Sequence, residues 1–153
     1  MHLPAQRTVF SGDAVSSSTR RQPGGHPVRR AGPLSKVAGP RARVPATGAE
    51  VIVPGHGPVP GPAGVREHTG CLAYVRESAH VLHTAGSPAA EAARRVIDEG
   101  RHPAPGLPER LVVAIGSEHR YLDGSELPGS LRMTADVAAA SHGADAACTG
   151  GRA

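Results

Sequence analysis

The strongest constraint on the fold is a stripe of mostly apolar side chains in the middle of the chain. Its members recur at intervals of three and four residues, at Val65, His68, Leu72, Val75, Ala79 and Leu82. Such intervals place side chains on one face of an α-helix. The spacing therefore predicts one long amphipathic helix from about Gly64 to Ala85, which Gly86 ends.

Two further helices are predicted after this one. Ser87 can cap a helix whose first position is Pro88, where the missing N–H of proline costs nothing, and Gly100 is a C-terminal stop. A third stretch keeps helical spacing from Pro108 until Gly124. We therefore expect three helices between residues 64 and 124.

The rest of the chain has few large apolar side chains and many helix breakers. Val, Leu, Ile and Phe make up 28 of the 153 residues, about 18 %, which is below the roughly 20 % under which disorder is expected. Five prolines lie within Ser16 to Gly48, and Gly39-Pro40 interrupts the one helical pattern there. We expect Ser16–Gly48 to be irregular, and residues 128–153 to be disordered apart from a weak helix near Leu131–Ala140.

The net positive charge of the chain comes from its first third. Residues 1–49 hold eight basic side chains and one acidic one, a net of +7, and residues 50–153 hold nine and twelve, a net of −3, which sum to +4. Phe10 is the only aromatic side chain among residues 1–49. This basic part of the chain therefore lacks platforms on which nucleobases could stack. Nucleic acid is therefore not a predicted partner, and a basic arm that binds polyphosphate is the less favoured alternative.

Cysteines and hydropathy indicate a cytoplasmic protein. Cys71 and Cys148 lie 77 residues apart with no paired spacing, which favours reduced thiols over a disulfide framework or a zinc ribbon. The N-terminus has no apolar core of a signal peptide, and no run approaches the roughly 20 apolar residues of a membrane span. We expect no membrane segment.

Two short strands are predicted before the helices. The stretch "RTVFSGDAV" (Arg7 to Val15) is a β-branched and aromatic run that closes in a turn at Gly12-Asp13. The stretch "EVIV" (Glu50 to Val53) is a continuous apolar run of the buried kind, ended by Pro54.

A single histidine, His56, stands between Gly55 and Gly57 just after the second strand. Ligands of α/β folds bind outside the carboxyl ends of strands, and glycines let the backbone turn sharply and an ion approach. From the spacing alone, a metal ligand and a surface turn are equally favoured.

The motifs around these strands resemble the metallo-β-lactamase-fold hydrolases. "VIVPGHGPV" followed by "REHTGCLAYVRES" is similar to the loop of that family that holds its last metal-binding histidine and to the helix after it. "TVFSGDAV" is similar to the motif that carries the family's bridging aspartate, and "PERLVVAIGSEHRYLDGSEL" resembles its closing helix. The resemblance covers about residues 7–127 and implies that Asp13 and His56 are metal ligands.

The family's signature HxHxDH motif does not occur in this sequence. In the family it lies upstream of the aspartate motif, but here only twelve residues precede Asp13, and His2 is the one histidine among them. The resemblance implies a dinuclear zinc centre that hydrolyses a small-molecule ester, thioester or lactam-like substrate. A catalytic zinc needs about three protein ligands, so we expect zinc binding to be weak or absent and this chain to be inactive alone.

Other histidines are interpreted as structural. His80 and His83 lie three residues apart on the first predicted helix, and Glu77 with His80 has a Glu-x-x-His spacing whose required second copy is missing, so a solvated helix face is expected. His68 lies on the apolar stripe, which favours a packed core histidine. His119 lies in the closing helix with no assigned role.

The predicted class is α/β, a partial metallo-β-lactamase-type αββα sandwich with a three-helix C-terminal extension. Residues 1–63 would form the partial sandwich, 64–127 the helical extension and 128–153 the tail. The predicted function is that of a C-terminal fragment of a zinc-type hydrolase. The alternative is a small non-catalytic helical interaction module with a basic N-terminal arm, and neither the substrate nor an oligomeric state is predicted.

Overall fold

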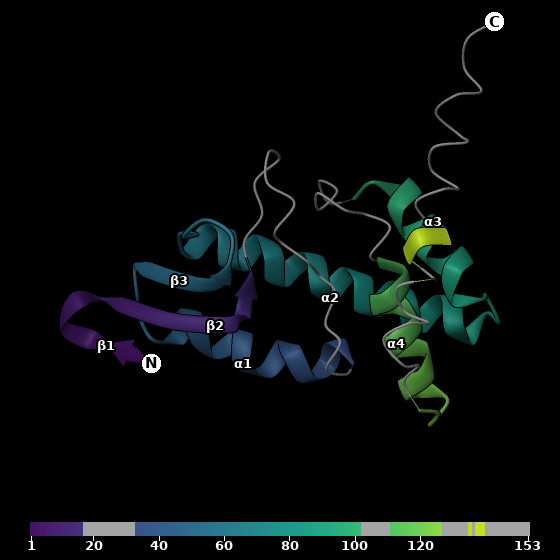
Figure 1. Cartoon of the computed structure of the whole chain (residues 1–153), viewed down its shortest axis with the longest axis horizontal. Coiled ribbons are helices and arrows are strands. Elements are labelled where there is room, and N and C mark those ends of the chain that lie inside the picture. Colours follow the sequence, from purple (N-terminus) through teal and green to yellow (C-terminus); the bar gives the residue numbers. More distant parts are fainter. Residues whose placement is uncertain (17–32, 102–110, 127–134, 136, 140–153) are drawn as a thin grey trace, which may run out of the picture.

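The computed structural model describes residues 1–16, 33–101, 111–126, 135 and 137–139, without the side chains of residues 13, 16, 37, 38 and 40. A small sheet lies at one end of the molecule (Figure 1). Two long helices, α1 (Leu34–Ala46) and α2 (Pro62–Thr84), run from it toward the other end, where α3 (Ala89–Glu99) and α4 (Leu111–Leu122) lie. The predicted mixed α/β class is confirmed.

The sheet has three strands in the order β1, β2, β3. β1 (His2–Leu3) pairs antiparallel with β2 (Thr8–Ser16) after a single 3-10 turn over Pro4–Gln6, and β2 pairs parallel with β3 (Val51–His56). α1 lies between β2 and β3 in the chain, so these three elements make a β–α–β unit. Parallel neighbours need such a crossover because their ends lie far apart.

Both predicted strands continue past the residues that were expected to end them. β2 runs through Gly12-Asp13 instead of turning there, because Gly12 takes a φ of 52° and makes an irregularity in the ladder that the strand survives. β3 runs through Pro54 to His56. Proline is tolerated there because β3 lies at the edge of the sheet in the described residues, where one side of the strand needs no donor.

The expectation that Ser16–Gly48 is irregular is wrong for Leu34–Ala46, which forms α1. α1 spans 13 residues and contains Gly39-Pro40 in its interior. Tertiary contacts outweigh the poor helix propensity: the Leu34 N–H donates to Glu118 Oε2 at 2.8 Å, and the buried Arg41 donates from Nε to the Ala14 carbonyl at 2.7 Å. The same prediction also covers residues 17–32, which lie outside the described residues.

Pro40 offers a direct test of this account of α1. It lies in the interior of the helix, where a proline lacks the N–H that the helical ladder uses. Pro40→Ala should therefore raise the free energy of unfolding by about 1 kcal/mol or more in urea titrations. Gly12→Ala is the control and should lower it, since Gly12 has a positive φ that alanine rarely adopts. A destabilising Pro40→Ala would show that α1 does not form in solution.

The three helices predicted between residues 64 and 124 are confirmed. α2 and α3 begin within two residues of the expected positions, with Pro88 in place of Ser87 as the N-cap of α3. Gly100 closes α3 in the left-handed region at φ 58°, as a C-terminal stop requires. Residues 102–110, where α4 was expected to begin, lie outside the described part, and residues 135 and 137–139 are helical within the predicted weak helix of the tail. No helix in the described residues combines the length and the apolarity of a membrane span.

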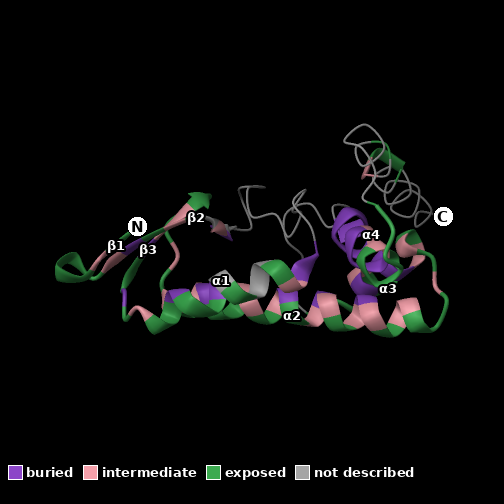
Figure 2. Ribbon diagram, turned by 90° about the horizontal axis from the view of Figure 1, so that it is seen from below, coloured by how far each residue is buried: buried purple, intermediate pink, exposed green. Residues whose placement is uncertain are grey.

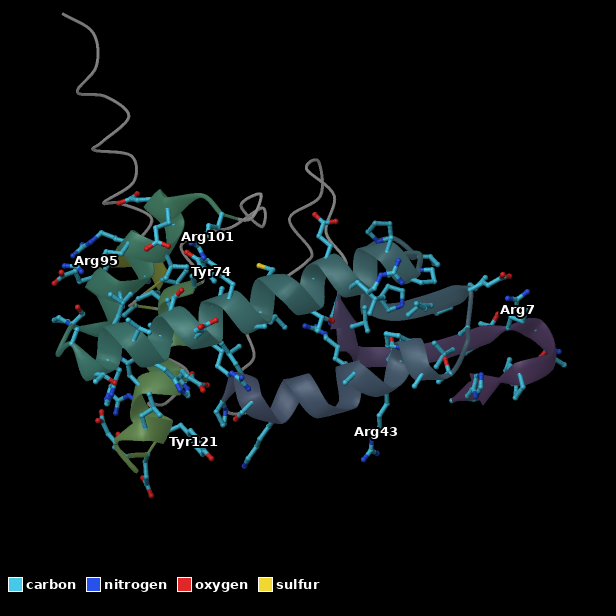
Figure 3. All side chains as sticks on the ribbon, turned by 180° about the vertical axis from the view of Figure 1, so that it is seen from behind. Arg7, Arg43, Tyr74, Arg95, Arg101 and Tyr121 are labelled. Carbon is cyan, nitrogen blue, oxygen red and sulfur yellow. The ribbon has the colours of Figure 1, made fainter. Side chains whose placement is uncertain are left out.

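The end of α3 is fastened to α2 through Tyr74. The Tyr74 hydroxyl hydrogen-bonds to the Glu99 carboxylate, and the Arg101 guanidinium carbon lies 5.6 Å from the centroid of the Tyr74 ring. Figure 3 shows the Tyr74 and Arg101 side chains beside one another. These contacts tie the C-terminal end of α3 to the middle of α2.

Buried side chains form two separate clusters, joined by α1 and α2 (Figure 2). The helical cluster lies among α2, α3 and α4 and includes Leu34 from the start of α1. The sheet cluster is smaller and consists of Val9, Val15, Val44, Ala49, Ile52 and Val65. α1 begins with Leu34 in the helical cluster and reaches Val44 in the sheet cluster, whereas α2 begins with Val65 in the sheet cluster and reaches Leu72 in the helical cluster. The two helices therefore run antiparallel and link both clusters.

Candidate functional site

The two predicted metal ligands lie on neighbouring strands at the same end of the sheet. Asp13 is in β2 and His56 is the last residue of β3, and in the parallel ladder Gly12 is opposite Pro54 and Ser16 is opposite His56. This is the carboxyl end of both strands, where α/β folds bind ligands. The backbone thus brings Asp13 and His56 to one edge of the sheet, where His56 is exposed.

The backbone at this edge is irregular in both strands. Between the two paired positions β2 advances four residues, from Gly12 to Ser16, while β3 advances two, from Pro54 to His56. The surplus residues of β2 include Asp13, and the residue after His56, Gly57, takes a φ of 84°. Bulges of this kind redirect side chains next to functional sites, and a positive φ favours glycine over residues with a Cβ.

A buried arginine stands next to this edge. Arg41 is 1 % exposed, and its Nε donates at 2.7 Å to the carbonyl of Ala14, the residue after Asp13. Its guanidinium carries a permanent positive charge. A metal cation bound between Asp13 and His56 would be repelled by that charge, which lowers the affinity of the site for zinc.

The described side chains do not supply a full zinc ligand set. Within the described part of the chain, no group of three or more His, Cys, Asp or Glu residues is placed to hold a metal ion. His2 lies opposite Val9, near the start of β2 and away from the edge where His56 lies. Burial raises the pKa of the Cys71 thiol on α2, with Arg41 opposing and Glu67 adding to that shift, and a thiol that resists ionisation is a poor zinc ligand. The residues that the structure describes therefore fit a partial site only.

A second cluster of ionisable groups lies between α2 and α4, and Glu118 is its centre. The Glu118 side chain is 0 % exposed. One carboxylate oxygen accepts the Leu34 N–H at 2.8 Å, and the other lies 2.8 Å from Nε2 of His80, which donates to it. Glu118 thus connects the first residue of α1 to both α2 and α4.

Two histidines meet beside this carboxylate. His83 of α2 donates from Nε2 to Asp123 at 2.7 Å, and its ring meets that of His119 edge to face, with centroids 4.9 Å apart. His119 is buried and donates from Nε2 to the Ala79 carbonyl at 3.0 Å. Burial lowers the pKa of His119, and the neighbouring His83 lowers it further.

His80 and His83 are partly exposed, in line with the expected solvated helix face, but each also pairs with a carboxylate of α4 or of the turn after it. Their helical spacing was visible in the sequence. The carboxylate partners are 38 and 40 residues away, a separation that no helical pattern relates. The one available signal was that Glu118 and His119 belong to a polar run, Ser117 to Arg120, in an otherwise apolar stretch. His68, expected in the core, is half-buried.

No family model, curated protein or solved structure matches this chain. The geometry of the two sites is therefore the basis on which a function is proposed.

Proposed function

We propose that this chain carries the C-terminal half of a metallo-β-lactamase-fold hydrolase, in which Asp13 and His56 occupy metal-binding positions. The observation that supports the proposal is the parallel pairing of β2 and β3, which places the two motif residues at one carboxyl edge. The order of elements adds to it: strand with Gly-Asp, helix, strand with Pro-Gly-His-Gly-Pro, and long helix. The partial αββα sandwich is part of this proposal.

Zinc in this family supplies a metal-bound water that attacks the substrate. In this chain, Asp13 and His56 would hold the ion, Gly55 and Gly57 would leave space for it, and Arg41 would oppose its charge. Two ligands beside a buried cation form a weak site, so we propose that the chain alone has no appreciable hydrolase activity.

A metal titration tests the assignment of the two residues. In histidine-resolved NMR spectra, added Zn²⁺ should perturb the His56 ring before the other histidine rings. Asp13→Asn should weaken that binding by roughly tenfold, because a ligand of the same ion is lost. Asp98→Asn, an exposed change on α3, is the matched control and should leave it unchanged. Zinc binding that survives both Asp13→Asn and His56→Ala would refute the assignment.

Activity should be absent from the isolated chain. We expect less than one zinc ion per chain after desalting, and ester, thioester and β-lactam probes should be hydrolysed at background rates even with added zinc, because metal binding requires a full ligand set. His56→Ala should then leave those rates unchanged. Metal analysis by mass spectrometry and spectrophotometric hydrolysis assays check this. Stoichiometric zinc together with hydrolysis that His56→Ala abolishes would overturn the proposed inactivity.

The second candidate is a non-catalytic helical interaction module. It is favoured by the size of the helical cluster, which holds twelve buried residues and does not involve the carboxyl edge of the sheet. The same titration separates the two candidates, because an interaction module predicts that zinc binding does not depend on Asp13 and His56.

A further inference from the structure

The ring of His119 lies buried between α2 and α4, where a positive charge on the imidazole is disfavoured. It is 7 % exposed, and its Nε2 carries a proton because the Ala79 carbonyl, 3.0 Å away, can only accept. In the neutral ring the other nitrogen, Nδ1, has no proton. Protonation would add a buried charge and a second N–H donor.

The charged groups that act on His119 come from α2 and from the end of α4. His83 and His80 lie on α2, and the ring of His83 contacts that of His119. Asp123 lies just beyond the end of α4. Asp123 is already bound by His83, and Glu118 is bound by His80 and by the Leu34 N–H. The buried residues of α3 are Ala92, Ala93 and Val96, which bring no compensating charge. A cationic His119 would therefore meet the His83 ring, while the favourable charge of Asp123 is shared with His83.

We propose that protonation of His119 weakens the docking of α4 on α2, so that this interface opens on acidification. The opening exposes the buried face of α4 and releases the contact that Glu118 makes with the start of α1. The device is independent of the metal site, since His119 lies in the helical part of the molecule and Asp13 and His56 lie in the sheet.

The direction of the pH dependence follows from burial. The pKa of His119 in the folded state is lowered from its ordinary value of 6.5, first by burial and then by His83. The open state therefore takes up a proton more readily than the closed one, and closure is favoured above the ordinary histidine pKa and lost as the pH falls below it. Both His80–Glu118 and His83–Asp123 are retained in His119→Gln, so that variant isolates the contribution of His119.

Hydrogen exchange measures the opening region by region. Between about pH 7.5 and 5.5, after correction for intrinsic exchange rates, α4 amides should lose protection relative to those of β2 and β3, by up to about tenfold per pH unit, the limit for one proton. His119→Gln keeps an N–H donor for Ala79 without a titrating group and should flatten this dependence. His2→Gln, an exposed change at the start of the chain, should leave it as in the unmodified chain.

Three outcomes would overturn the proposal. The first is α4 protection that is equal or higher at the acidic pH. The second is a full pH dependence in His119→Gln. The third needs no variant: in NMR titration of the unmodified chain, the His119 ring would take up its proton at or above the ordinary histidine pKa. A His119 midpoint below that value, together with loss of α4 protection over the same pH range, supports it.

Discussion

Replacement of Glu118 by alanine should remove about 3 kcal/mol from the free energy of unfolding. The side chain is fully buried and accepts hydrogen bonds from the Leu34 N–H and from His80. Removal leaves a buried main-chain donor without its acceptor, which costs about 1–3 kcal/mol, and adds a cavity and the loss of the interhelical hydrogen bond to His80. Because whole domains are stable by only about 5–15 kcal/mol, a large part of the population should unfold at moderate temperature.

Urea titration followed by far-ultraviolet circular dichroism measures this, since the chain has no tryptophan for fluorescence. Glu118→Gln keeps one acceptor oxygen and should lose only about 1 kcal/mol. Glu77→Ala, an exposed glutamate on α2, is the matched control and should change stability by less than about 0.5 kcal/mol. Equal stability of Glu118→Ala and Glu77→Ala would mean that Glu118 is not buried in solution.

Ile52→Ala should unfold the sheet while the helical cluster stays folded. Ile52 is 0 % exposed and lies in the six-residue sheet cluster, which also contains Val9 and Val65. Truncation of a buried isoleucine costs about 2–5 kcal/mol. The sheet cluster has few other apolar contacts to offset that loss, whereas the helical cluster includes no residue of β2 or β3.

Hydrogen exchange distinguishes local from global unfolding in this variant. Amides of β2 and β3 should lose protection, while those of α3 and α4 should keep it. Val51→Ala is the matched control, because Val51 is the preceding residue of β3, is 41 % exposed and points to the opposite face of the sheet. Parallel loss of protection in α4 would show instead that α1 and α2 unite the two clusters into one cooperative unit.

The two clusters bear on what the chain could do. A sheet that can open by itself would carry Asp13 and His56 on the less stable part of the molecule, so the proposed metal positions would be held loosely. The His119 device lies in the more stable part. The two proposals can therefore fail independently of one another.

The sequence by itself determined the elements whose signals are local. The spacing from Val65 to Leu82 fixed the extent of α2, and the left-handed glycine at residue 100 closed α3 where its position predicted. β2 and β3 were also identified, because β-branched runs between turn residues are detected within a few residues of chain. Asp13 and His56 were named as candidate metal ligands through the resemblance of their motifs to the metallo-β-lactamase-fold hydrolases.

Tertiary structure alone decided the features that depend on distant residues. α1 persists through Gly39-Pro40 because Leu34 and Arg41 find partners 84 and 27 residues away in the chain. Glu118 is buried as a hydrogen-bonded group for the same reason: its partners come from two other helices. Local propensity counts only the energies of neighbouring residues, and contacts between residues so far apart in the chain add several kcal/mol that no local pattern contains.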